Sequence, residues 1–140
     1  MRNINEDKVL RVIDANLNRA KEALRVCEDV TRFFFDNKKL TRNYKVLRHD
    51  LTDATTSLSE NHRKMIAARN ILNDVGVSST KSELKRRNIK DIFFANTQRA
   101  KESVRVLEEF TKLLSPKAAQ GFKKARYKIY ELEREIVTKF

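Results

Sequence analysis

Apolar residues recur at alternating intervals of three and four along residues 10–34. This spacing places them along one side of a helix, and a second apolar row beside the first makes that side wider than a surface helix needs. The first row is Leu10, Ile13, Leu17, Ala20, Leu24, Cys27, Thr31 and Phe34, and the second is Val12, Ala23, Val26, Val30 and Phe33. We therefore expect a helix from about Asn5 to Phe35 that is buried against more than one neighbour.

This helical pattern occurs twice in the chain. Residues 13–34 align without a gap with residues 93–114, and ten of the 22 positions are identical, among them Asn16/Asn96, Arg19/Arg99 and Glu28/Glu108. The next stretch recurs as well, because residues 44–51 align with residues 122–129 and so pair Arg48 with Arg126. We interpret this as an internal duplication of a helical hairpin.

The remaining pattern predicts the helices that complete each hairpin. Apolar spacing from Leu40 to Leu58 predicts a helix over 39–58, and Ser115 before Pro116 marks the start of another that runs to near Thr138. Only two glycines and one proline occur, which limits tight turns and indicates an all-α fold. We expect a single helical domain over 1–140: hairpin 1 at about 5–58, an insert at 59–91 and hairpin 2 at about 92–138, with the four main helices packed as a bundle.

The insert at 59–91 has no duplicate. Its residues 65–72, MIAARNIL, favour a short helix, and residues 73–80, NDVGVSST, favour an exposed loop. Thr80 and Glu83 fit a capping box for a short basic helix that ends at Asn88. Asp74 is the candidate ligand for a hard cation, although an Asp-Val-Gly sequence is more often only a turn.

Two polar residues fall within each wide apolar arc, Asn16 and Arg19 in the first copy and Asn96 and Arg99 in the second. Buried amide and guanidinium groups need partners. One interpretation is structural, with each group bonded to acids such as Glu22 or to backbone carbonyls. The other is that the two pairs converge across a pseudo-two-fold axis on one polar pocket for an anionic ligand.

The net charge of the chain indicates what kind of molecule it binds. The chain carries 31 basic and 19 acidic side chains, a net charge of +12, which favours an anionic partner, either nucleic acid or a small phosphorylated compound. Solvated helical faces would also account for most of this charge. The chain has no apolar run long enough to span a bilayer and no secretory pattern, so we expect a cytoplasmic protein without a membrane partner. The lone Cys27 is expected to be a buried structural thiol.

Four motifs in a fixed order carry a family resemblance: DANLNRAKEALRVCEDVTRF, LRHDL, AARNILNDVG and FFANTQRAKESVRVLEEFTK. Together, over about Val9 to Leu132, they resemble the small helical domain that precedes thiamine-phosphate synthase in many bacteria. That domain is regarded as a kinase that uses ATP and Mg²⁺ to convert hydroxymethylpyrimidine phosphate to the diphosphate. The positions that fall in these motifs are Asn16, Arg19, Glu22, Arg25, Arg48, His49, Arg69, Asp74, Gly76, Asn96, Arg99, Glu102 and Arg105.

The resemblance implies an enzyme, a phosphotransferase with ATP and Mg²⁺ as cofactors. Among the motif positions, Asp74 is our candidate metal ligand and catalytic residue, and the candidates for substrate binding are Asn16, Arg19, Asn96, Arg99, Arg48, Arg69 and Gly76. Candidate partners are the phosphorylated pyrimidine, thiamine-phosphate synthase and a second copy of the chain. The sequence has no Gly-rich phosphate loop, so side chains and helix amino termini would have to hold phosphates. A basic nucleic-acid-binding module and a non-catalytic helical domain associated with the synthase remain the alternatives.

Overall fold

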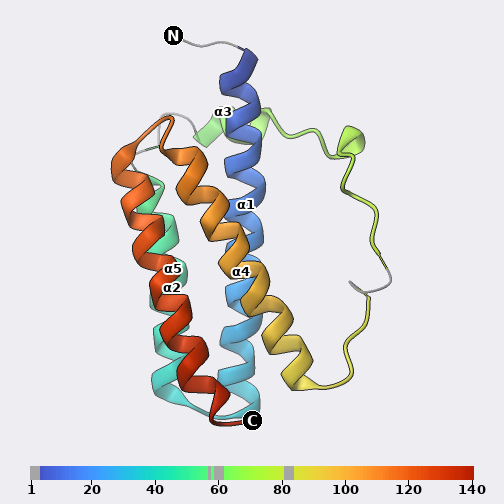
Figure 1. Cartoon of the computed structure of the whole chain (residues 1–140), viewed down its shortest axis with the longest axis vertical. Coiled ribbons are helices and arrows are strands. Elements are labelled where there is room, and N and C mark those ends of the chain that lie inside the picture. Colours follow the sequence, from blue (N-terminus) through green and yellow to red (C-terminus); the bar gives the residue numbers. More distant parts are fainter. Residues whose placement is uncertain (1–3, 57, 59–61, 81–83) are drawn as a thin grey trace.

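The structure is a computed structural model that describes residues 4–56, 58, 62–80 and 84–140. Every secondary-structure element in these residues is helical, which confirms the predicted all-α class. Four long helices dominate (Figure 1): α1 (Ile4–Asp29), which continues as the π-helical turn η1 (Val30–Phe34), α2 (Lys38–Ala54), α4 (Ile89–Thr111) and α5 (Pro116–Val137). The connection from α2 to α4 contains the short α3 (His62–Ala67) and the 3-10 turn η3 (Ile71–Asn73).

The four long helices pack together as a bundle. α1 makes its most extensive contact with α4, and α2 packs on both α1 and α5, which in turn packs on α4. Figure 1 shows α1 and α4 side by side and running in opposite directions. Because α1 and α4 are antiparallel, a residue of the first repeat copy does not in general lie beside its equivalent in the second copy. No helix among the described residues is both long and apolar enough to cross a membrane.

Side-chain caps fix where three of the helices begin. The Asn37 side chain accepts a hydrogen bond from the Leu40 amide (2.9 Å), Asn88 from the Asp91 amide (2.9 Å), and Ser115 from the Ala118 amide. The start at Pro116 is as predicted. Asn88 was expected to end a basic helix; instead it begins α4, and residues 84–88 are not helical. Glu83 of the predicted capping box lies outside the described residues.

Helix α2 ends at Ala54, four residues before the predicted end. Here the hydroxyls of Thr55 and Thr56 donate to backbone carbonyls three residues earlier, at 2.6 and 2.7 Å. Such local bonds compete with helical continuation, which accounts for the early end. The insert contains a short helix, but α3 begins before the predicted stretch 65–72 and ends within it, at Ala67. Residues 74–80 are irregular, as predicted.

The core contains the first apolar row of α1, with Leu10, Ile13 and Leu24 fully buried. The pattern fails at the end of both apolar rows, because Phe33 of the second row and Phe34 of the first are 61% and 62% exposed. The reason is the π-helical turn η1, which contains one more residue per turn and so rotates the side chains that follow it. Thr31 inside that turn remains buried and donates its hydroxyl to the Glu28 carbonyl.

Candidate functional site

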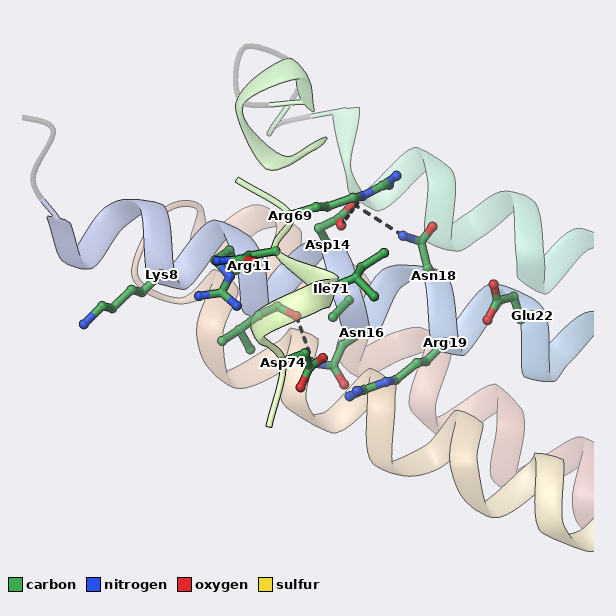
Figure 2. A pocket seen from close by; sticks show the side chains of 13 residues that line it. Lys8, Arg11, Asp14, Asn16, Asn18, Arg19, Glu22, Arg69, Ile71 and Asp74 are labelled. Carbon is green, nitrogen blue, oxygen red and sulfur yellow. Dashed lines mark hydrogen bonds and ion pairs between the residues drawn. The ribbon is translucent and has the colours of Figure 1, made fainter. Parts of the chain in front are cut away.

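A cleft of about 730 Å³ lies between the first half of α1 and the segment that follows α3 (Figure 2). Helix α1 supplies one wall, with side chains three or four residues apart that share one face. Residues 69–74 supply the other wall. The lining residues are Lys8, Arg11, Val12, Asp14, Ala15, Asn16, Asn18, Arg19, Glu22, Arg69, Asn70, Ile71 and Asp74.

The two walls are joined by an ion pair between Asp14 and Arg69. The Arg69 Nε and Nη2 atoms donate to the two carboxylate oxygens of Asp14 at 2.6 and 2.9 Å, a bidentate geometry. The Asn18 amide also donates to this carboxylate, at 3.4 Å. The hydrogen bond and negative charge of Asp14 raise the pKa of Arg69. Arg69, predicted to bind substrate, lies at the cleft with its guanidinium engaged by Asp14.

Asp74 lies at the cleft, just after η3, and is half-buried. One carboxylate oxygen accepts a hydrogen bond from the Gly76 amide at 2.8 Å, which fixes the orientation of the side chain. Figure 2 shows Asp74 close to Asn16 and Arg19. Gly76 itself is exposed and does not line the cleft, so its observed contact is with Asp74.

Asn16 and Asn96 are buried, as predicted, and make identical contacts. The amide of Asn16 donates to the Val12 carbonyl and that of Asn96 to the Ile92 carbonyl, each at 2.8 Å. In each asparagine, a backbone carbonyl one turn earlier thus accepts one hydrogen bond from the side-chain amide. This contact agrees with the interpretation that the two asparagines have a structural role. Asn16 also lines the cleft.

The predicted burial of Arg19 and Arg99 is wrong, because both side chains are exposed. A long side chain can begin on the edge of an apolar face and still carry its guanidinium into solvent. Arg19 does so at the margin of the cleft, where it is a lining residue.

The predicted convergence of the two Asn/Arg pairs on one cavity is also wrong. Cys27 of α1 contacts Thr97 of α4, with Sγ and Oγ1 3.5 Å apart, so these residues mark one level of the bundle. Asn16 precedes Cys27 by eleven residues and therefore lies about 16 Å along α1 from that level. Asn96 is adjacent to Thr97 and lies at the level of Cys27, so Asn16 and Asn96 are far apart along the antiparallel pair. The cleft contains Asn16 and Arg19 but neither Asn96 nor Arg99.

Arg48, another predicted substrate-binding residue, is away from the cleft in an ion pair with the buried Glu28, at 2.8 Å. Its repeat equivalent Arg126 forms the same pair with the buried Glu108, at 2.9 Å. The Glu108 hydrogen bond raises the pKa of Arg126. These matched pairs agree with the hairpin duplication read from the sequence, which itself stays a prediction.

Of the cations that line the cleft, Lys8 and Arg11 were not predicted from the sequence, whereas Arg19 was. Lys8, Arg11 and Arg19 are exposed, and among the described residues no carboxylate forms an ion pair with any of them. Sequence reasoning missed Lys8, Arg11 and Asp14 because the stretch before residue 15 shows no identity between the two copies. The signal that could have identified these three residues is that each differs from its equivalent in the second copy.

A second groove lies beside the start of α4, lined by Leu84, Lys85, Arg86, Arg87, Asp91, Phe94 and Ala95. Within it, Arg87 is paired with Asp91 at 3.0 Å. This groove does not include Asn96 or Arg99, so it is not an equivalent of the α1 cleft.

A Mg²⁺ ion would find only a partial protein site. Within the described residues no three acidic, histidine or cysteine side chains are grouped as a metal cage. Asp74 nevertheless offers a hard carboxylate oxygen at the cleft. Mg²⁺ in nucleotide sites is commonly held by one or two carboxylates together with phosphates and water, so Asp74 fits an ion that arrives with a nucleotide.

Sequence comparison relates the chain to thiamine-phosphate synthases. The protein of that name from Nostoc punctiforme is 38% identical over 130 residues, which cover 92% of this chain and 35% of that protein. The one from Rhodopirellula baltica is 36% identical over 140 residues, covering 99% and 37%. The chain thus spans little more than a third of the length of these relatives. No solved structure matches it.

The repeat, and all the cleft-lining residues except Lys8, fall within a region that matches a known family. The sequence model of the ThiD2 family matches residues 11–135, which contain α2, α3 and α4, most of α1 and all but the last two residues of α5. The chain therefore belongs to the ThiD2 family.

Proposed function

We propose that this chain is a kinase of thiamine biosynthesis that transfers a phosphoryl group from ATP to hydroxymethylpyrimidine phosphate. Membership of the ThiD2 family and similarity to thiamine-phosphate synthases support the pathway. The observation that carries the reaction class is the cleft, which is lined by the Asp74 carboxylate and by the cations Lys8, Arg11 and Arg19, none of which forms an ion pair within the described residues. Phosphoryl transfer depends mainly on charge neutralisation and alignment, for which these side chains suffice.

The two substrates would occupy different stretches of α1. Asn16 and Arg19 lie next to Asp74, whereas Lys8 and Arg11 lie towards the amino-terminal end of the cleft (Figure 2). Arg19 suits the phosphate of the pyrimidine through its fork of donors, and Asn16 offers the aminopyrimidine edge its amide. Lys8 and Arg11 would then hold the nucleotide phosphates. The cleft volume lies within the range of about 300–1,000 Å³ usual for ligand sites.

In the proposed reaction, a phosphate oxygen of the pyrimidine phosphate attacks the γ-phosphorus of ATP. A new P–O bond forms, the bond to the β-phosphate oxygen breaks, and ADP leaves. Arg19 neutralises the attacking phosphate, and Lys8 with Arg11 stabilises negative charge on the departing side. Mg²⁺, when bound, would offset further phosphate charge, with Asp74 as its protein ligand.

The direct test is ADP release by the purified chain with ATP, Mg²⁺ and hydroxymethylpyrimidine phosphate, with the diphosphate identified by phosphorus NMR. Turnover should require the phosphorylated pyrimidine, so the unphosphorylated alcohol is the matched control. Absence of turnover, together with no thermal stabilisation by either substrate, would contradict the proposal. A complex with RNA or DNA whose affinity falls steeply with salt would favour the nucleic-acid alternative instead.

A further inference from the structure

The segment that forms the outer wall of the cleft has little apolar contact with the bundle. Leu72 is 97% exposed and Val75 fully so, and Ile71 is 65% exposed. The segment's own hydrogen bonds are short-range: Asn73 to Asn70, Gly76 to Asp74, and the amide of Asp74 to the Ile71 carbonyl. Hydrophobic burial therefore does not determine where this segment lies.

The contact that does join it to α1 is the bidentate pair between Arg69 and Asp14. Side-chain exposure is 42% for Arg69 and only 10% for Asp14, so the carboxylate is a nearly buried acceptor on a rigid helix. Among the described residues 69–77, no other side-chain hydrogen bond reaches α1. Since Asp74 follows Arg69 by five residues and a tight 3-10 turn, fixing Arg69 restricts where the Asp74 carboxylate can lie.

The second copy lacks the features that build this site. The α4 residue equivalent to Asp14 is Phe94, whose ring packs against Phe93 at 5.2 Å and Phe140 at 5.7 Å. The equivalents of Lys8 and Arg11 are Asn88 and Asp91, so two cations are replaced by an amide and an acid. No carboxylate is present on α4 to receive a guanidinium at the position of Asp14.

We infer that Asp14 is a positioning residue, and that through Arg69 it docks residues 69–76 over α1 and confines the ligand site to the first repeat copy. This inference rests on the proposed function, because Asp74 is the residue that docking places. Asp14 acts through Arg69 and does not itself touch the reacting phosphates. Each chain accordingly has one site, not two related by the repeat.

The docking is tested without any substrate. Nitroxide labels at Val75→Cys and Lys123→Cys, both exposed positions, in a Cys27→Ala background report the distance between the segment and α5 by double electron–electron resonance. The parent chain is expected to give a single narrow distance distribution, and Asp14→Asn and Arg69→Gln should each broaden it. The double variant with the charges exchanged, Asp14→Arg with Arg69→Asp, should restore a narrow distribution. An unchanged distribution in Arg69→Gln, which alters a half-exposed side chain, would overturn the inference even if Asp14→Asn failed to fold.

The kinetic arm separates positioning from binding. Asp14→Asn should lower kcat by about 100-fold, the scale of loss from a small misplacement of catalytic groups. KM for the pyrimidine phosphate should stay within about twofold, because Arg19 and Asn16 remain in place on α1. Asp91→Asn, which breaks the Arg87 pair on α4, is the matched control and should change neither value. Equal losses in both variants would overturn the inference, whereas an inactive parent chain with intact docking would contradict only the proposed function.

Discussion

Helices α1 and α4 share a sequence pattern and differ in what covers them. Each buries an asparagine bonded to the carbonyl one turn earlier and a glutamate paired with an arginine from the neighbouring helix. Only α1 carries Lys8, Arg11 and Asp14 and has the segment after α3 docked on it. The shared asparagine and glutamate–arginine contacts therefore maintain the bundle, whereas the unshared Lys8, Arg11 and Asp14 distinguish the cleft on α1 from the matching face of α4.

The largest expected effect concerns the shared ion pairs. Arg48→Met and Arg126→Met each remove the closer of two cations from a buried glutamate, which then keeps only a contact of 3.9 Å with Arg25 or of 3.8 Å with Arg105. Each variant should lower the free energy of unfolding, towards the lower end of about 3–5 kcal/mol. Urea denaturation of the two variants should give similar losses, because the pairs are equivalent. A variant Arg48→Met with normal stability and lost substrate binding would instead place Arg48 in the ligand site.

The next largest effect is on activity and distinguishes Arg19 from its repeat equivalent Arg99. Arg19→Met should lower kcat/KM for the pyrimidine phosphate by about 100-fold or more, since a charge-assisted contact to phosphate is removed. Arg99→Met, its repeat equivalent, should leave kcat/KM unchanged. Both side chains are exposed, so both variants should keep the wild-type melting temperature. Equal losses of activity would mean that the two copies act together.

A smaller effect tests the close contact between α2 and α5. A Cβ added at Gly121 would lie 2.9 Å from the Cβ of Ala54, so Gly121→Ala should cost about 1–3 kcal/mol from overpacking, partly offset by better helix propensity. Asn43→Ala, at the equivalent position of α2, is the control, because no contact equivalent to that with Ala54 is involved. In urea denaturation, Ala54→Gly should reduce the loss of unfolding free energy caused by Gly121→Ala. Additive losses in the double variant would contradict the steric explanation.

The effect that is smallest at neutral pH, and is seen only in alkali, concerns Cys27, which the second copy replaces with Leu107. Burial raises the pKa of the Cys27 thiol from 9.0 to about 12, so the folded chain should resist alkylation at pH 8. Because the folded pKa is the higher one, this contribution to stability is complete below pH 9 and declines as pH rises towards 12, by up to about 1.4 kcal/mol per unit. Cys27→Ala should show a shallower alkaline decline in urea denaturation. Rapid alkylation under native conditions would contradict this burial.

The sequence predicted the bundle well because apolar spacing and caps are local signals. The start of α5 at Pro116 followed from its capping signal, and the burial of Asn16 and Asn96 followed from periodicity. Helical angle did not predict the exposure of Arg19, since a long side chain can leave the face on which it begins. The missed partner of Arg48 was detectable, because Glu28/Glu108 and Arg48/Arg126 recur together in the repeat.

The position of the cleft could not be predicted from periodicity. It depends on a contact between Asp14 and Arg69, which are 55 residues apart and lie in a helix and an irregular segment. The antiparallel packing of α1 and α4 is a tertiary property, and it placed the two Asn/Arg pairs at different levels. The identities showed which residues the copies share, whereas the cleft also depends on Asp14 and Arg69, which have no counterpart in the second copy.

The most direct test of a single site on α1 is isothermal titration calorimetry of the chain with hydroxymethylpyrimidine phosphate, in the presence of Mg²⁺ and a non-hydrolysable ATP analogue. The account predicts one bound pyrimidine phosphate per chain, with binding lost in Arg19→Met and retained in Arg99→Met. Two equivalent sites per chain, or loss of binding in Arg99→Met, would contradict it.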